Sequence, residues 1–148
     1  MKTVIITGAS RGIGAQTARL FAKNGYATII NYNKSEKEAL ALKQELLEQG
    51  CCVELFRADV SNYNECKAMA DYVAKKYKRI DVLVNNAGIS QIKPLFDVSE
   101  DDFDLVMSTN FKSVFNMCKV VSDYMVSQKY GKIINLSSVW GEIGRAHV

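Results

Sequence analysis

The stretch Thr7-Gly8-Ala9-Ser10-Arg11-Gly12-Ile13-Gly14 decides the fold of this chain. The apolar, β-branched run before it, residues 4–6, is typical of a buried strand in a parallel sheet. A helical pattern follows over residues 13–24, with one face formed by Ile13, Thr17, Leu20, Phe21 and Asn24. A strand, a glycine-rich turn and a helix leave unpaired N–H groups at the helix N-terminus, where the helix dipole attracts an anion. The stretch therefore predicts a phosphate site, and the alternative is an ordinary glycine-rich turn.

Predicted strands and helices alternate along the rest of the chain. Further strands are expected at residues 26–31, 53–57, 80–84 and 132–136, and helices at 35–49, 62–77 and 99–127. Ser35 with Glu38 predicts a capping box at the first of these helices, and Ser99 before an acidic turn predicts the start of the last. The alternation indicates an α/β fold, with helices on both faces of one parallel sheet.

The composition is that of one soluble domain. The chain has 148 residues and a net charge of +3, and its lysines and arginines are scattered rather than clustered. We therefore expect no nucleic-acid partner, and no membrane partner either, because no apolar stretch approaches the length of a membrane span. The four cysteines lack metal-ligand spacing and His147 has no partner set, so we expect no metal and free thiols in a cytoplasmic protein.

Asn85-Asn86-Ala87-Gly88 forms a second polar turn, directly after the predicted strand at 80–84. The patterns TGxxxGxG and NNAG, in this order, resemble the short-chain dehydrogenase/reductase family over residues 2–144. The resemblance implies a Rossmann-type, doubly wound parallel sheet with strand order 3-2-1-4-5, whose C-terminal strands are missing here. It also implies that residues 1–144 are an NADP-binding domain, the N-terminal part of a single-domain reductase.

The residues after the second strand bear on the choice of cofactor. An NAD enzyme usually places an acid there, which bonds the ribose 2′-hydroxyl. This chain has Asn33 and Lys34 instead, and Arg11 supplies a second cation within the glycine-rich turn. A guanidinium can bond a phosphate through two parallel N–H groups. These residues favour NADP(H), and the alternative is that Arg11 and Lys34 are solvated surface charges.

The resemblance also assigns the rest of the cofactor site. It implies that Asp59 accepts a hydrogen bond from the adenine amino group, with Val60 beside it; alternatively, Asp59 caps the next turn. Asn86, Ala87 and Gly88 would line the adenosine ribose and the middle of the cofactor. The complete expected set is Gly8, Ser10, Arg11, Gly12, Ile13, Gly14, Asn33, Lys34, Asp59, Val60, Asn86, Ala87 and Gly88.

Asn110 is the first expected catalytic residue. It falls on the apolar stripe of the long helix, which comprises Val106, Val114, Cys118, Val121 and Met125. A buried amide needs hydrogen-bond partners, so one interpretation is a satisfied core asparagine. The resemblance implies the other interpretation, in which the Asn110 backbone holds a water of a proton relay.

Ser138 is the second expected catalytic residue. It follows the strand at 132–136, and the resemblance of the string INLSSVWG to the family implies that Ser138 donates a hydrogen bond to the substrate carbonyl, whereas Ser137 is structural. Such a bond stabilises charge as hydride arrives. The family's proton donor is a tyrosine that follows this serine, with a lysine one helical turn later. Counted from Ser138, both positions fall beyond Val148.

The C-terminal residues suggest how the sequence arose. Residues 142–148 resemble an in-frame translation of a sequencing adapter. Because residues 141–144 also fit the family, a foreign tail on a truncated reading frame is expected only at 145–148. The alternative is a natural short protein. Truncation would leave the strand at 132–136 as an exposed sheet edge and the long helix without its partner. We therefore expect a poorly soluble fragment without hydride transfer, whereas the parent is expected to be a homotetramer.

The expected reaction of the parent is the NADPH-dependent reduction of a ketone to a secondary alcohol, as in 3-oxoacyl-(acyl-carrier-protein) reductases. A narrower resemblance competes, because residues 31–35 and the string SSVWGEIG look like reductases of the 5-aminopentanone group on elongation factor P. Trp140 could shape the pocket of such an enzyme, or simply pack. The carbonyl substrate would thus be bound to a carrier protein or to another protein. A non-enzymatic NADP-binding module is the alternative from a different class.

Overall fold

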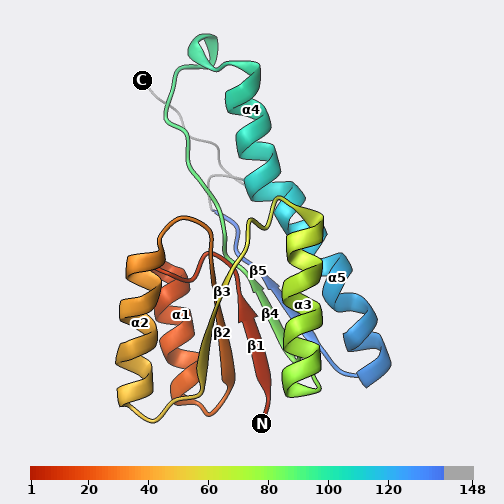
Figure 1. Ribbon diagram of the computed structural model, residues 1–148. Coiled ribbons are helices and arrows are strands. Elements are labelled where there is room, and N and C mark those ends of the chain that lie inside the picture. Colours follow the sequence, from red (N-terminus) through yellow and green to blue (C-terminus); the bar gives the residue numbers. More distant parts are fainter. Residues whose placement is uncertain (139–148) are drawn as a thin grey trace.

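The computed structural model describes residues 1–138 and contains one parallel sheet. Its strands are β1 (Thr3–Ile6), β2 (Ala27–Tyr32), β3 (Val53–Arg57), β4 (Val82–Asn85) and β5 (Lys132–Asn135). They lie in the order β3-β2-β1-β4-β5, which confirms the predicted α/β class and strand order (Figure 1). The expected tail at 145–148, with His147 and Trp140, lies outside the described residues.

Helices cover both faces of the sheet (Figure 1). The helices α1 (Gly12–Lys23) and α2 (Glu36–Glu48) pack on one face, and α3 (Tyr63–Tyr77) and α5 (Ser113–Gln128) pack on the other. Side chains alternate along β1. Val4 and Ile6 therefore belong to the core beneath α1 and α2, while Ile5 belongs to the core beneath α3 and α5. Because helices cover both faces, a ligand site is expected at the carboxyl ends of the strands.

The helix α1 buries a different face from the predicted one. Its buried residues are Gly14, Ala15, Ala18 and Ala22, whereas Ile13 is 68% and Leu20 is 65% exposed. Small side chains let the helix backbone lie close to β1 and β2, and larger apolar residues there would hold it away. Close packing against the sheet has decided the orientation of this helix.

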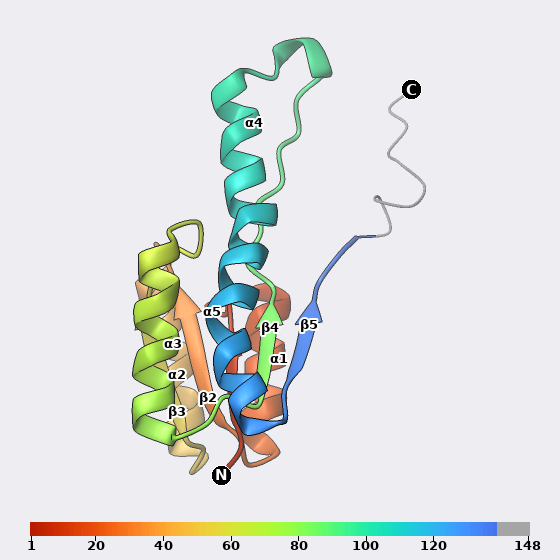
Figure 2. The same cartoon turned by 90° about the vertical axis from the view of Figure 1, so that its right-hand side faces the viewer.

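The predicted long helix at 99–127 is divided into three parts. It consists of α4 (Glu100–Met107), a π-helical turn η2 (Ser108–Lys112) and α5, and the short helix η1 (Leu95–Asp97) precedes it. Figure 2 shows that η1 and α4 project away from the sheet. A π turn shifts the residues after it around the helix axis. The buried face of α5 comprises Ser113, Asn116, Met117, Val120, Val121 and Met125. Of the predicted stripe, only Val121 and Met125 belong to this face.

The capping box predicted at Ser35 and Glu38 is wrong. Ser35 is the N-cap of α2, but its side chain makes no capping hydrogen bond, because its φ of −89° and ψ of 61° lie outside the extended region that capping requires. A capping box does open α4, where the Ser99 hydroxyl and the Asp102 carboxylate each accept from the other's backbone N–H. Asn62 caps α3 through the N–H groups of residues 64 and 65.

Strand β5 is the sheet edge within the described residues, as expected. It pairs with β4 alone among them, and its apolar side chains Ile133 and Ile134 are 40% and 46% exposed. None of the helices within residues 1–138 combines the length and apolarity needed to span a membrane.

Candidate functional site

A cavity of about 550 Å³ opens at the carboxyl ends of β1, β2, β3 and β4. Every predicted cofactor-binding residue except Gly14 lines it. The lining comprises Gly8, Ser10, Arg11, Gly12, Ile13, Asn31, Tyr32, Asn33, Lys34, Ser35, Ala58, Asp59, Val60, Ser61, Asn86, Ala87, Gly88, Ile89, Leu105 and Thr109. The cavity thus joins four loops that are far apart in the sequence.

The glycine-rich turn packs directly against the NNAG turn. Asn86 Nδ2 donates to the carbonyl oxygens of Thr7 and Gly8 at 2.9 and 3.0 Å, and the Thr7 hydroxyl accepts from the N–H groups of Asn86 and Ala87. Gly8 has a φ of +60°, and a Cβ on it would lie 2.8 Å from Ala87 Cα. A Cβ on Gly14 would lie 2.4 Å from Asn86 Nδ2. Gly14 therefore serves this packing rather than the cavity wall.

Asn31 is a site residue for which sequence reasoning assigned no role in the cavity. Its side chain lies at the end of β2 and the residue is 2% exposed. Its Oδ1 accepts from Gly8 N at 3.2 Å, and its Nδ2 donates to the carbonyl oxygens of Phe56 and Ala58 at 3.2 and 3.0 Å. One amide thus connects the glycine-rich turn with the end of β3. A polar amide in an apolar strand was the available signal, because buried amides need partners.

Two helix N-termini border the cavity without side-chain caps. Arg11 is the N-cap of α1 and Ser35 that of α2, and neither side chain makes a capping bond. The first N–H groups of a helix have no partner within the helix, so these two N-termini can bind anions. Arg11 and Lys34 add positive charge at the same place, and both are exposed. The residues present fit a phosphorylated dinucleotide.

Asp59 lies on the adenine side of the predicted site. Its Oδ1 accepts from Ser61 N at 2.9 Å and from the Ser61 hydroxyl at 2.7 Å. Burial alone would raise the pKa of the Asp59 carboxyl, but the bonds from Ser61, with Asn33 and Lys34 nearby, bring it below its ordinary value. One carboxylate oxygen of Asp59 thus caps the turn at Ser61, as the alternative interpretation expects. The residue also lines the cavity, as a charged hydrogen-bond acceptor.

Asn110 is exposed, so its interpretation as a buried core asparagine is wrong. It belongs to the π turn η2, in which no residue is buried, and the same is true of the preceding helix α4. Its Nδ2 donates to Ile89 O at 2.8 Å, and its Oδ1 accepts from Ile89 N at 2.8 Å. The amide thus holds the segment that follows the NNAG turn, where Gly88 and Ile89 line the cavity.

Ser138 follows β5 and is exposed, as is Ser137. The end of β5 is tied to that of β4, because Asn85 Nδ2 donates to Asn135 Oδ1 at 2.8 Å and Leu136 N donates to Asn85 O at 3.0 Å. Ser138 therefore stands at the same edge of the sheet as the cavity. Among residues 1–138, however, it is not part of the cavity lining.

The described residues contain no group of three His, Cys, Asp or Glu side chains that could hold a metal ion. The four cysteines are free thiols. Burial raises the pKa of the Cys66 thiol to about 12, so this thiol is protonated at neutral pH.

Comparison with known proteins gives consistent matches. A model of the short chain dehydrogenase family matches residues 2–148. The 3-oxoacyl-(acyl-carrier-protein) reductases of Staphylococcus aureus and Thermotoga maritima are each 41% identical over 143 residues, which is 97% of this chain and 58% of those proteins. The chain thus spans little more than half the length of these curated relatives.

Two solved structures are similar over almost the whole chain. A gluconate 5-dehydrogenase from Burkholderia cenocepacia, in complex with NADP and tartrate, has a TM-score of 0.90 and 35% identity over 99% of this chain and 57% of its own. A metagenomic short-chain oxidoreductase in complex with NADP has a TM-score of 0.89 and 31% identity over 99% of this chain and 64% of its own.

Proposed function

This chain belongs to the short-chain dehydrogenase family, and on that premise we propose that its cavity binds NADPH and that the protein reduces a ketone to a secondary alcohol. The observation that carries the proposal is the cavity itself, in which two uncapped helix N-termini meet two cationic side chains at the carboxyl edge of the sheet. A dinucleotide with an additional phosphate matches this set of donors and charges.

Each part of the cofactor has a proposed partner. The diphosphate would lie at the N-terminus of α1, and the 2′-phosphate among Arg11, Lys34 and the Ser35 hydroxyl at the N-terminus of α2. Glu36, the first residue of α2, accepts from the Tyr32 hydroxyl of β2 at 3.1 Å. The structural relatives named above contain NADP, which supports the same choice. Asp59 and Val60 would receive the adenine.

NADPH would supply the hydride when bound, and the chain's residues would orient the carbonyl. The Ser138 hydroxyl would donate a hydrogen bond to the carbonyl oxygen, which stabilises the charge that develops there. Asn110 would hold the segment at Ile89 that forms the wall beside the reacting half of the cofactor. The resemblance expects the proton donor, a tyrosine, at a position later than Val148.

We propose a 3-oxoacyl group on a carrier protein as the substrate, because the bacterial relatives act on such substrates by name. The second candidate is the 5-aminopentanone group on elongation factor P, which residues 31–35 and Trp140 favour by resemblance. A homotetrameric assembly and a cytoplasmic location, where the thiols stay reduced, belong to the same proposal.

Nucleotide binding tests the cofactor proposal. Dissociation constants for NADPH and NADH should be measured by titration for the wild type, Arg11→Ala and the control Lys23→Ala, whose side chain lies in the last turn of α1. The wild type should prefer NADPH, and Arg11→Ala should weaken NADPH binding about 10- to 100-fold, because charged hydrogen bonds contribute about 1.5–3 kcal/mol. NADH binding and the control should stay near wild type. Equal affinity of the wild type for both nucleotides would overturn the proposal.

Reductase activity tests the reaction. The parent gene should read Tyr-x-x-x-Lys in frame soon after the codon for Gly144, and the longer protein that it encodes should oxidise NADPH in the presence of an acetoacetyl thioester or of modified elongation factor. The chain of 148 residues by itself should show no carbonyl-dependent loss of NADPH absorbance. Tight NADPH binding with no reduction of any carbonyl by the longer protein would favour a non-enzymatic binding module.

A further inference from the structure

Asn116 lies on α5, outside the cavity lining, yet it is bonded to the loop that forms the adenine side of the cavity. We propose that Asn116 is a positioning residue, which aims Asp59 at the adenine through one rigid peptide unit. The proposal rests on the proposed function, because it concerns how the NADPH cavity is shaped. It adds a residue that the sequence motifs do not include.

The contacts of Asn116 are two consecutive carbonyl groups. Its Nδ2 donates to Val60 O and to Ser61 O, each at 3.1 Å, and the residue is 2% exposed. Both carbonyls belong to the loop between β3 and α3, and residues 58–61 of that loop line the cavity. The amide reaches this loop across 56 positions of the sequence.

The geometry links Asn116 to Asp59. The carbonyl of Val60 and the N–H of Ser61 belong to the same planar peptide unit, so fixing the first fixes the direction of the second. That N–H donates to Asp59 Oδ1 at 2.9 Å. Asn116 therefore determines where this N–H points, and the N–H in turn holds the Asp59 carboxylate in place.

Two other side chains also hold the loop. Asn31 donates to Ala58 O at 3.0 Å from β2, and the Cys66 thiol donates to Val60 O at 3.2 Å from α3. Asn116 completes this set from α5. A buried amide with two acceptors fixes direction as well as distance, which an apolar side chain of the same size would not.

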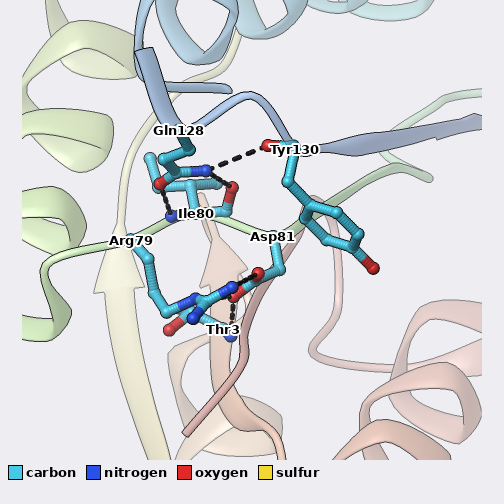
Figure 3. Close-up of polar contacts among 6 residues, drawn as sticks. All are labelled: Thr3, Arg79, Ile80, Asp81, Gln128 and Tyr130. Carbon is cyan, nitrogen blue, oxygen red and sulfur yellow. Dashed lines mark hydrogen bonds and ion pairs between the residues drawn. The ribbon is translucent and has the colours of Figure 1, made fainter. Parts of the chain in front are cut away.

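Gln128 provides a matched control on the same helix. Its Nε2 donates to Ile80 O at 2.8 Å and to Tyr130 O at 3.1 Å, and its Oε1 accepts from Ile80 N at 2.8 Å (Figure 3). These bonds resemble those of Asn116, but they lie at the amino end of the sheet. If Asn116 had only a structural role, substitution of Asn116 and of Gln128 should therefore change stability and nucleotide affinity alike.

The experiment compares Asn116→Leu with Gln128→Leu. Dissociation constants for adenosine 2′,5′-bisphosphate and for NADPH are measured by calorimetry at a temperature where circular dichroism shows each variant folded, and urea midpoints report stability. Asn116→Leu should raise both dissociation constants about tenfold, and by the same factor because both probes carry adenine. Gln128→Leu should lower the urea midpoint at least as much, with both constants within about twofold of wild type.

The outcomes separate the two proposals. If the folded wild type binds neither probe, the proposed function fails and the role of Asn116 falls with it. If the wild type binds but Asn116→Leu binds equally well, or Gln128→Leu loses affinity to the same extent, the positioning role is overturned while the proposed function stands.

Discussion

The two ends of the sheet use polar groups in opposite ways. At the amino end, the Asp81 carboxylate is 0% exposed and accepts from Arg79 Nε at 2.7 Å, from Arg79 Nη2 and from Thr3 N at 2.8 Å, while Gln128 bonds both backbone groups of Ile80 (Figure 3). At the carboxyl end, Arg11 and Ser35 leave two helix N-termini uncapped toward a cavity. The amino end stabilises the fold, whereas the carboxyl end keeps donors available for a ligand.

The ionisation of Asp81 follows from this arrangement. Burial by itself would raise the pKa of the Asp81 carboxyl, but the Arg79 guanidinium and the Thr3 N–H bring it below its ordinary value. The Arg79 side chain is 42% exposed, so the Arg79–Asp81 ion pair is only partly buried. The charged Asp81 carboxylate at the amino end is therefore fully paired within the protein and needs no ligand.

The largest expected effect comes from breaking the amino end. Asp81→Ala removes the carboxylate that accepts from Arg79 and from the buried Thr3 N–H. It should lower the free energy of unfolding by about 3 kcal/mol. This is the low end of the range for breaking a buried ion pair, because Arg79 is partly solvated. Urea unfolding measures this loss. NADPH affinity of the folded variant should stay at the wild-type value.

A surface pair supplies the control for Asp81. Lys67→Ala removes an exposed ion pair with Asp71, and it should cost about 0.5 kcal/mol or less. The contrast between the two ends breaks down if folded Asp81→Ala loses NADPH affinity, since the amino end would then also shape the cavity.

The pH dependence of stability should show the same difference between the two ends of the sheet, with an effect of intermediate size. The pKa of Asp81 is lower in the folded state than in the unfolded state, so its stabilisation is present above the unfolded value of about 3.9 and is lost as pH falls toward the folded value. Each such proton gives a slope of at most about 1.4 kcal/mol per pH unit. Urea unfolding between pH 5 and pH 3 should give a shallower slope for Asp81→Asn than for wild type.

Asp59→Asn is the corresponding variant at the carboxyl end. Asp59 also has a lowered pKa, so its stabilisation is lost in acid in the same direction. Because Asp59 lies at the wall of an open cavity, its variant should flatten the slope less than Asp81→Asn does. An equal or larger change for Asp59→Asn would show that both ends contribute alike to acid stability.

The smallest expected effects come from two N-cap serines. Ser99→Ala removes a capping box and should destabilise α4 by about 1 kcal/mol, measured by amide hydrogen exchange in that helix, with no change in NADPH binding. Ser35→Ala removes a hydroxyl that caps nothing, so it should leave stability unchanged and raise the NADPH dissociation constant about threefold. A destabilised Ser35→Ala protein with normal affinity would contradict this contrast.

Sequence patterns predicted the elements and most of the cavity wall. The motifs at 7–14 and 85–88 placed the loops correctly because strand and helix patterns are local and the carboxyl ends of parallel strands meet at one edge. The buried face of α1 was wrong because apolarity was the only guide, whereas close packing selected its alanines. The burial of Asn110 was wrong because the first part of the long helix extends beyond the sheet (Figure 2), and no residue of α4 or η2 is buried.

Sequence alone determined the α/β alternation, the family and the charges near the expected phosphates, because these depend on residue types and short spacings. Tertiary structure decided which polar groups are paired and which remain available. Asn31 bonds a carbonyl 27 positions away and Asn116 one that is 56 positions away, so neither role is visible in a local pattern. The same holds for Ser35, whose hydroxyl makes no capping bond because its φ of −89° and ψ of 61° lie outside the extended region that capping requires. A buried polar group must find its partner wherever the fold brings one, and only the fold says where that is.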